Sequence, residues 1–474
     1  MTVESQVPSG ESLSHVAVRY EAKTPQLRRY VTGYAIASTG IALLWTAVLA
    51  ILLPLHVQGI EFGQIFTGAD AGVDLPALEA LRTQVDAGEA VATAEQTRVL
   101  GLLAEYNAAR AGSLSILSSV GIILTMLIQP LVGMLSDRTR SPWGRRAPWI
   151  ASGAFIGAVL LAVLPIVGSI AMLLVVWSLV QLVVNTAQGP LSATVADRVP
   201  QERVGTVSAI TGVVGFLAAG LGVAAVGALF GVIGLGSYYV LAAALAVSVV
   251  PLLLMARDKS SAGMPVAKLK AGTIAASYVI ALRNRDYRWA WIAKVTLFIG
   301  YGAGSIYAIY MLQSYIAPAL STSDAAATAP LLQLAAIPGT IVAMAISGRW
   351  SDKIQRRKPF VFAASVLIAG SFLAPLILPT LTGMFVQAIV AGFGLGLFIV
   401  IDQALFISVL PDRLSAGRDL GLATMAQNIG QALGPILAGV VVAVAGGQYG
   451  PIWVVAFVIA LGSAFAVLPI RGVR

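Results

Sequence analysis

Long apolar runs separated by short polar segments dominate the pattern of hydrophobic and polar positions along the chain. A helix needs about 20 apolar residues to cross the hydrocarbon core of a bilayer. The runs are far longer than the short alternating segments of a transmembrane barrel. The pattern therefore predicts an all-α membrane protein with twelve spans, at approximately residues 30–54, 111–136, 147–167, 169–193, 203–229, 236–256, 288–314, 329–349, 359–378, 380–409, 418–445 and 451–470.

Between the first two spans lies a polar segment, residues 56–110, that is too polar to enter the membrane. It contains "LPALEALRTQV" and "AEQTRVLGLLAEYNAA", in which apolar and polar positions alternate at helical spacing. These runs predict an amphipathic helical hairpin outside the bilayer. The hairpin is either a passive insertion or a lid over the outer mouth.

The distribution of charge predicts the orientation of the chain. Apolar residues make up 58% of the sequence and charged residues 11%, against about a quarter charged in soluble domains. Apart from Lys294 within a span and Arg82, Arg98 and Arg110 in the insertion, the lysines and arginines fall in segments on one side. The positive-inside rule places that side, with both termini, in the cytoplasm of a cell-membrane protein. The same bias accounts for the net charge of +9 without a nucleic-acid partner.

Several kinds of chemistry are missing from the sequence. No cysteine is present, which excludes disulfides and thiolate metal sites, and no "GxxxxGK" phosphate loop occurs. No set of nucleophile, base and orienting acid can be assembled from the spans. We therefore expect neither an enzyme, nor a bound cofactor, nor a metal.

An internal repeat divides the chain into two similar halves. The stretch "SDRTRSPWGRRAPWI" recurs as "SDKIQRRKPFV", and "AQGPLSATVADRVPQER" aligns with "DQALFISVLPDRLSAGR" at the same offset of 215 residues. Several matches at one offset indicate a real repeat. Each copy holds six spans in the same orientation. The expected organisation is a cytoplasmic tail (1–29), a first six-helix bundle with the insertion (30–256), a cytoplasmic linker (257–287) and a second bundle (288–474).

The repeated charged hairpins are candidate gates. Aspartates at a helix end can pair with arginines of the following turn, and such contacts could hold the halves together in one state and break in the other. Gly133 should allow close approach of a neighbouring helix. Alternatively, the arginines only determine topology. The candidate gating residues are Gly133, Asp137, Arg145, Arg146 and Arg198 in the first half, and Asp352, Arg356, Arg357 and Arg413 in the second.

These motifs carry a resemblance to a known family. "GMLSDRTRSPWGRRAPWI" resembles the signature between the second and third spans of the major facilitator superfamily, in the form found in sucrose:proton symporters and in glycoside, pentoside and hexuronide cation symporters. "NTAQGPLSATVAD" resembles the fourth-span segment of the sucrose symporters. The resemblance implies a six-plus-six facilitator fold and transport of sugars. It supplies no ion site, because Gln181 stands where sucrose symporters have a proton-carrying aspartate, and the second span holds no carboxylate.

Two ionisable residues lie well inside apolar runs, Lys294 and Asp402. Asp402 is about 15 Å along its helix from the inner boundary, near the midplane. Charges at this depth are costly, and each is therefore a functional candidate with a partner or a water-filled cavity. The two could pair, and protonation of Asp402 would then release Lys294, which describes a proton switch. Alternatively, Lys294 extends to the cytoplasm and Asp402 is a hydrogen-bonded structural carboxyl.

Neutral polar and aromatic residues line helix faces around these two charges. Amides and hydroxyls beside a ring that can stack on a pyranose suit an uncharged polyol. Taken singly, such residues also serve in packing between helices. The candidate substrate-binding residues are Tyr34, Ser38, Trp45, Trp177, Gln181, Asn185, Gln188, Tyr301, Ser305 and Gln403.

The sequence thus predicts a secondary transporter that moves a neutral sugar or glycoside by alternating access, with the proton as coupling ion. The alternatives are an uncoupled facilitator or efflux pump, and a membrane sensor that binds without transport. We expect a monomer in the lipid bilayer whose partner is a small molecule, a mono- or disaccharide or a glycoside.

Overall fold

The structure is a computed structural model that describes residues 20–21, 24–263, 282–354, 357–409 and 416–470. At some positions in α4, α7, α12, α15 and α16 only the backbone is described. All described elements are helical, in agreement with the predicted fold class. Within the described residues, nine helices are long and apolar enough to cross a membrane, or ten when the bent pair α10 and α11 is one span.

Each of the twelve predicted spans corresponds to a helix or a set of consecutive helices. The first bundle consists of α1 (Pro25–Ala47), η2 (Val48–Leu52), α2 (Leu53–Ile65), α4 (Ala94–Arg138), α5 (Ala147–Val163), η4 (Leu164–Ile166), α6 (Ile170–Arg198), α7 (Gln201–Ile233), η5 (Gly234–Gly236) and α8 (Ser237–Met255). The second consists of α10 (Arg285–Ser305), α11 (Ala308–Ser314), α12 (Thr322–Ile354), α13 (Lys358–Ser371), α14 (Leu373–Ile377), α15 (Leu381–Ser408), α16 (Ala416–Val444) and α17 (Pro451–Val467).

The two bundles repeat one packing scheme. In the first bundle α1 packs on α7 and α8, α5 packs on α6 and α8, and α4 packs on α6. In the second, α10 packs on α16 and α17, α13 packs on α15 and α17, and α12 packs on α15. Between the bundles, α4 contacts α16 and α7 contacts α12, which are also equivalent pairs. The halves are therefore parallel repeats related by a pseudo-twofold axis, as their order in the sequence predicts.

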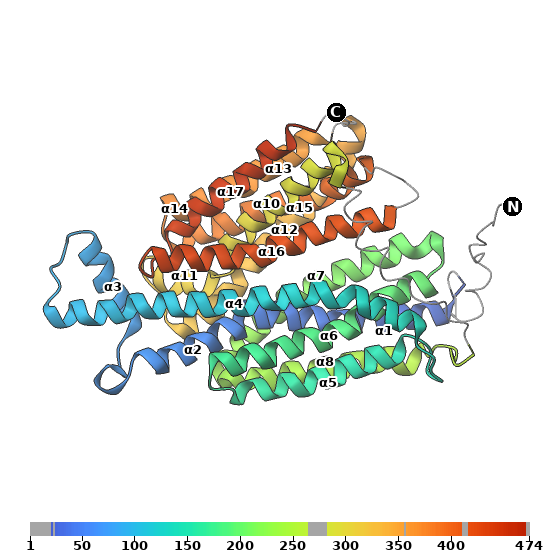
Figure 1. The fold of residues 1–474 in the computed structure, drawn as a ribbon, viewed down its shortest axis with the longest axis horizontal. Coiled ribbons are helices and arrows are strands. Elements are labelled where there is room, and N and C mark those ends of the chain that lie inside the picture. The colour runs from blue at the N-terminus through green and yellow to red at the C-terminus, as the bar shows by residue number, and fades with distance from the viewer. Residues whose placement is uncertain (1–19, 22–23, 264–281, 355–356, 410–415, 471–474) are drawn as a thin grey trace.

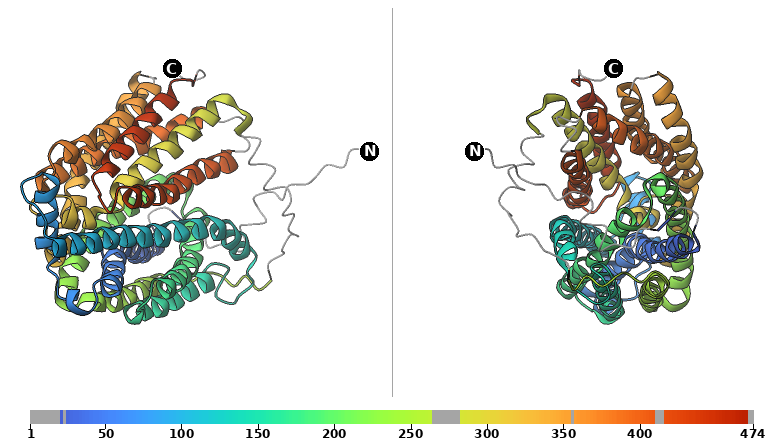
Figure 2. Two further views of the ribbon diagram at one scale, coloured as in Figure 1. Left: turned by 60° about the vertical axis from the view of Figure 1, so that its left-hand side comes forward. Right: turned by 90° about the vertical axis from the view of Figure 1, so that its right-hand side faces the viewer.

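The bundles meet at one end of the molecule and separate toward the other. We call the end that carries the insertion the insertion end, and the end where α1 begins and α17 ends the termini end. Helices α4 and α16 run side by side at the insertion end and diverge toward the termini end (Figures 1 and 2). Ser119 on α4 donates a hydrogen bond to the carbonyl of Ala432 on α16 near the insertion end, whereas a Cβ added at Gly133 would meet no atom within 4 Å. The two bundles therefore diverge toward the termini end.

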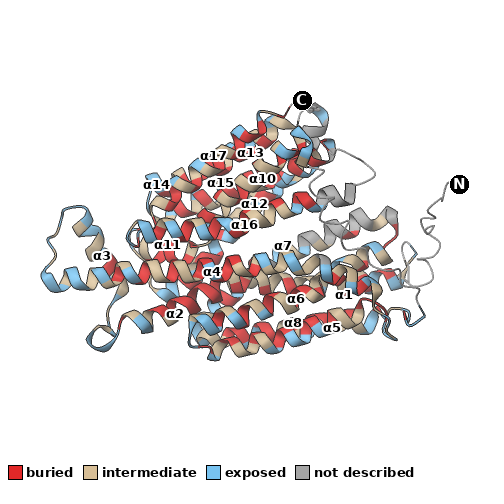
Figure 3. Ribbon diagram, in the orientation of Figure 1, coloured by how far each residue is buried: buried red, intermediate tan, exposed pale blue. Residues whose placement is uncertain are grey.

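The insertion combines extensions of two spans with one short helix. Helix α2 continues to Ile65, η3 (Gly68–Asp70) and α3 (Leu75–Asp86) follow, and α4 then begins well outside the bundle. Helix α4 has 45 residues and is about 67 Å long, roughly twice the thickness of the hydrocarbon core. Thr93 and Gln96 form a capping box at its start. Phe66, Leu78, Leu103 and Tyr106 form a separate small core, while the tip of the insertion is exposed (Figure 3).

A π-helical segment interrupts the first span between α1 and α2. Pro54 has no backbone N–H, and in a regular helix its ring would collide with the carbonyl four residues earlier. The widened turn over Val48–Leu52 shifts the hydrogen bonding by one residue, so that the N–H of Leu53 bonds to the carbonyl of Val48. This turn follows Trp45, one of the candidate substrate residues.

Candidate functional site

The two charges predicted inside the spans lie in contact. Lys294 on α10 donates to Oδ2 of Asp402 on α15 at 2.8 Å, and the two side chains are 13% and 5% exposed. The ammonium also lies 5.3 Å from the centre of the Phe406 ring, one helical turn beyond Asp402. Lys294 thus contacts a carboxylate within the bundle, as the first of the two alternatives predicts, and does not extend to the cytoplasm in this conformation.

A second polar contact joins the candidate residues of α1 and α6. The indole N–H of Trp45 donates to Oε1 of Gln188 at 2.8 Å, and both side chains are half-buried. The Trp45 ring meets the edge of the Trp177 ring with centroids 6.0 Å apart. This contact holds an amide beside an aromatic surface, the combination that recognition of a polyol requires.

Three of the candidate substrate residues follow one another at intervals of four along α6, on one face of the helix, and are buried between helices. Trp177, Gln181 and Asn185 are 0%, 4% and 1% exposed. Gln181 packs so closely against α4 that a Cβ at Gly121 would lie 2.5 Å from its amide nitrogen. In this conformation the three side chains face α1 and α4, and their role as substrate ligands stays a prediction. Gln188, at the end of the row, is the accessible member.

The amides of this row are bonded to a polar pair on α4 that the sequence analysis did not single out. Gln129 donates to Oδ1 of Asn185 at 3.1 Å, and Asn185 donates to the hydroxyl of Thr125 at 2.9 Å. Thr125 in turn approaches Oε1 of Gln181 at 3.4 Å. Thr125 and Gln129 are four residues apart, one turn of helix. That spacing within an apolar run is the signal by which they could have been found.

The remaining candidate substrate residues are distributed over three helices. Tyr34 and Ser38 on α1 and Tyr301 on α10 are half-buried, and Ser305 and Gln403 are exposed. The ring of Tyr34 lies 5.9 Å from that of Tyr30. Among the described residues, no side-chain hydrogen bond joins these five to the Lys294–Asp402 pair. Their role in binding stays a prediction.

The charged hairpin of the first bundle is a closed ion-pair cluster. Arg146 bonds to Asp137 at 2.6 Å and to Asp197 at 3.1 Å, and Arg145 bonds to Asp197 at 2.6 Å. Both arginines are largely buried. Asp197 stands at the end of α6 and faces the α4–α5 turn, so the cluster ties three helices of one bundle together.

Arg198 and Arg357 bond to residues of the same half of the chain. Arg198 pairs with Asp258 at 3.3 Å and bonds to the carbonyl of Ala256. Arg357 donates to the carbonyl of Ala404 and to the hydroxyl of Ser408. The close helix approach predicted at Gly133 is not seen, since a Cβ added there would meet no atom within 4 Å. Asp352, Arg356 and Arg413 lie outside the residues whose side chains are described.

A cavity lies at the insertion end, away from the candidate residues. It has a volume of about 1020 Å³ and is bounded by α2, α3 and the loops at the insertion end, with lining residues that include His56, Phe62 and Phe230. It contains none of the candidate substrate or coupling residues, and we do not assign the transport site to it.

Comparison with known proteins decides the family. The model of the Major Facilitator Superfamily matches residues 30–417 and 304–472. The chain belongs to the Major Facilitator Superfamily. This protein of the superfamily is therefore a multi-pass membrane transporter that takes a small molecule as its substrate, rather than an enzyme.

Solved structures agree with this fold. A point mutant of the nucleoside transporter NupG matches with a TM-score of 0.67 and 14% identity over 93% of this chain and 99% of that chain. A bacterial homologue of the human lysosomal transporter Spinster, solved inward-facing and unoccupied, matches with a TM-score of 0.63 and 15% identity over 95% and 98%. At these identities the likeness concerns the fold alone.

A curated relative matches over a short stretch. An uncharacterized symporter from Synechocystis sp. (strain ATCC 27184 / PCC 6803 / Kazusa) is 50% identical over 46 residues. The match covers 10% of this chain and 8% of that protein. It does not identify the substrate of this facilitator.

Proposed function

We propose that this facilitator is a proton-coupled symporter for a neutral sugar or glycoside, in which Asp402 carries the proton. The observation that supports the proposal is the Lys294–Asp402 pair, which is buried within the second bundle and bonded at 2.8 Å. A charged pair at this depth is costly to maintain and is typically retained for transport or coupling.

The proton would act by changing the bonding of Lys294. Deprotonated Asp402 accepts the ammonium hydrogen bond, and a protonated carboxyl attracts the ammonium less strongly. Loading of the proton thus frees Lys294 to bond a substrate hydroxyl or a carbonyl. Substrate and proton would then bind in a coupled manner, which is the requirement for symport.

The neutral groups support a polyol as substrate. Trp45 offers an apolar face, and Gln188 has an amide that can donate and accept. Tyr34 and Ser38 add hydroxyls on the same helix as Trp45. We propose that these residues face a shared path between the bundles that is open to the predicted cytoplasmic side.

Transport into proteoliposomes with an imposed pH gradient tests the function. Labelled mono- and disaccharides should accumulate against their gradient when the lumen is alkaline, and Asp402→Asn should abolish accumulation while exchange across the membrane continues. Asp324→Asn, which removes an exposed carboxylate at the start of α12, is the matched control and should accumulate sugar normally.

Four results would contradict the proposal. Equal sugar flux with and without the pH gradient would favour an uncoupled facilitator, and export would favour an efflux pump. Flux of nucleosides but not of sugars would reject the sugar class, and saturable binding without any flux would indicate a sensor.

A further inference from the structure

Arg110 on α4 is a buried cation enclosed by aromatic rings at the insertion end. The residue is 1% exposed, and its guanidinium lies 4.8 Å from the ring centre of Tyr106, 4.5 Å from that of Tyr310 and 5.4 Å from that of Tyr449. Tyr106 belongs to the same helix. The other two tyrosines belong to the second bundle.

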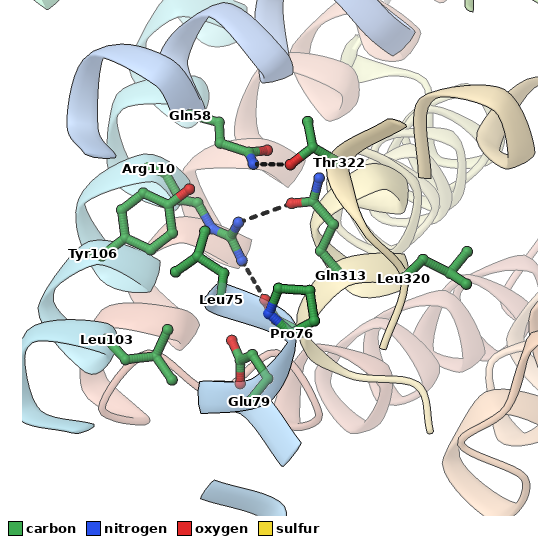
Figure 4. Close-up of a pocket in the computed structure, with 11 residues that line it drawn as sticks. Gln58, Leu75, Pro76, Glu79, Leu103, Tyr106, Arg110, Gln313, Leu320 and Thr322 are labelled. Carbon is green, nitrogen blue, oxygen red and sulfur yellow. Dashed lines mark hydrogen bonds between the residues drawn. The ribbon is translucent and has the colours of Figure 1, made fainter. Parts of the chain in front are cut away.

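The hydrogen bonds of Arg110 all reach across to the second bundle. Its Nη1 donates to Oε1 of Gln313 at 3.1 Å (Figure 4). Its Nε donates to the hydroxyl of Tyr449 at 3.0 Å, and Nη2 donates to the hydroxyl of Ser314. These acceptors are neutral. Because a buried charge is costly unless it is fully bonded, this arginine is stable in its place only while the two bundles are together.

Hydrogen bonds between neutral groups also join the two bundles near Arg110. Tyr307 and Tyr310 donate to the backbone carbonyls of Ala111 and Pro54, each at 2.8 Å. Ser115 donates to the carbonyl of Pro435 at 2.7 Å. The Tyr307 and Tyr310 rings are stacked with centroids 5.8 Å apart. The insertion end is thus joined by hydrogen bonds and rings around a single cation.

The insertion covers this cation from the aqueous side. Leu75, Pro76 and Glu79 of α3 line a cavity of about 20 Å³ together with Arg110 and Gln313 (Figure 4). A cavity of this size holds about one water molecule. Gln448 of the second bundle donates to Asp86, the last residue of α3, at 3.3 Å. The short helix therefore contacts both bundles and covers Arg110.

We propose that Arg110, held by Tyr310, Gln313, Ser314 and Tyr449, is the latch that keeps the insertion end closed, and that α3 is a strap that excludes water from the latch. Opening of the insertion end requires Arg110 to leave all of its acceptors at once. Under this proposal the insertion is a lid over the outer mouth and not a passive insertion. The inference rests on the alternating-access part of the proposed function and not on the substrate or the coupling ion.

Pulsed electron spin resonance on the full-length protein tests the latch. The chain has no cysteine, so Ile166→Cys and Ile377→Cys introduce a unique pair of labels on exposed positions, 74% and 72% exposed, at the insertion ends of the two bundles. In the unsubstituted background we expect one dominant short distance. In Arg110→Gln a longer distance should appear, and the ratio of open to closed molecules should rise about ten-fold, since three charge-assisted hydrogen bonds are lost.

The control is a second arginine on the same helix. Arg98 is bonded to Asp70 and Glu95 within the insertion and has no contact with the second bundle among the described residues. Arg98→Gln should leave the distance distribution unchanged. An equal shift in Arg98→Gln and Arg110→Gln would overturn the latch, because it would show that any loosening of the insertion opens this end.

Two milder variants keep the test decisive if Arg110→Gln does not fold. Tyr449→Phe retains the ring but removes the hydroxyl that accepts from Arg110, and it should shift the distances in the same direction by a smaller factor. Leu75→Asn should do the same by admitting water under α3, and no change there would remove the strap from the proposal. An unchanged distribution in folded Arg110→Gln or Tyr449→Phe would overturn the latch.

The outcome is separable from that of the proposed function. The spin-label distances are measured without substrate or pH gradient. A failure of sugar transport would leave the latch intact, and a failure of the latch would leave sugar transport intact.

Discussion

The buried pair of Lys294 and Asp402 sets the chemistry of the molecule at the scale of single residues. Both groups have lost most of their water and are compensated mainly by each other. Removing one partner leaves an unpaired buried charge, whereas replacing both leaves a neutral contact. The energetic role of the pair can therefore be separated from its role in coupling.

We expect Lys294→Met to lower the free energy of unfolding by about 3 to 5 kcal/mol, because Asp402 is then buried without its partner. The double variant Lys294→Met/Asp402→Asn should recover most of this loss. Thermal unfolding in detergent measures both effects. Equal destabilisation in the single and the double variant would show that the pair is not coupled.

At the same scale, Asp70 makes the insertion sensitive to acid. Hydrogen bonds from Arg98 hold the pKa of Asp70 below its ordinary value. The ionised carboxylate therefore stabilises the folded insertion above the unfolded pKa of about 3.9, and this stabilisation is lost as the pH falls through the lower pKa of the folded state.

Hydrogen exchange of the insertion between pH 7 and pH 3, expressed as protection factors, should show this loss of protection. In Arg98→Gln the decrease should be smaller, because Asp70 then has an ordinary pKa. Identical pH profiles in both proteins would contradict the assignment.

At the scale of helices, close packing depends on glycines at defined crossings. A Cβ added at Gly392 on α15 would lie 2.7 Å from the backbone oxygen of Ala336 on α12. Because backbone atoms cannot rotate out of the way, the helices themselves would have to separate. By contrast, a Cβ added at Gly370 on α13 would meet nothing within 4 Å.

These two positions give a matched pair of substitutions. Gly392→Ala should destabilise the protein by about 1 to 3 kcal/mol through overpacking. Gly370→Ala should be neutral or stabilising by up to about 1 kcal/mol, because alanine has the higher helix propensity. Melting temperatures of the two variants test the prediction, and a larger loss at Gly370 than at Gly392 would contradict the packing of α12 on α15.

At the scale of the whole molecule, the insertion end, where the bundles are joined, and the termini end, where they diverge, describe one state of the transporter. Arg145, Arg146 and Arg198 pair within the first bundle in this state. The bundles contact each other instead through Arg110 and the tyrosines around it. The two ends thus use different chemistry: ion pairs within a bundle at one, and an arginine held by neutral groups across bundles at the other.

Orientation in the membrane can be tested with single cysteines. Val91 in the insertion is 96% exposed, and Trp143 in the α4–α5 turn is 69% exposed. In intact cells a membrane-impermeant maleimide should label Val91→Cys but not Trp143→Cys, which should react only after permeabilisation. The reverse pattern would invert the orientation that the positive charges predict.

The sequence by itself determined the helices, the repeat and the presence of two charges deep in the spans. These properties follow from local hydropathy and from repeated sequence motifs. Each membrane-spanning helix must be apolar and must form its own backbone hydrogen bonds, wherever it lies in the bundle. Lys294 and Asp402 could be singled out in this way because a charge inside an apolar run is costly wherever the helix lies in the bundle.

Only the tertiary structure decided which residues meet. Trp177, Gln181 and Asn185 form the row that the spacing predicts, yet α4 covers it and adds Thr125 and Gln129. In the sequence, Arg110 is not distinguished from the other charged residues of the insertion. Its acceptors Gln313 and Tyr449 are 203 and 339 positions away along the chain. Hydropathy reports whether a residue is compatible with water or lipid, but the partner of a side chain depends on how helices far apart in sequence cross and on which end of the molecule is closed.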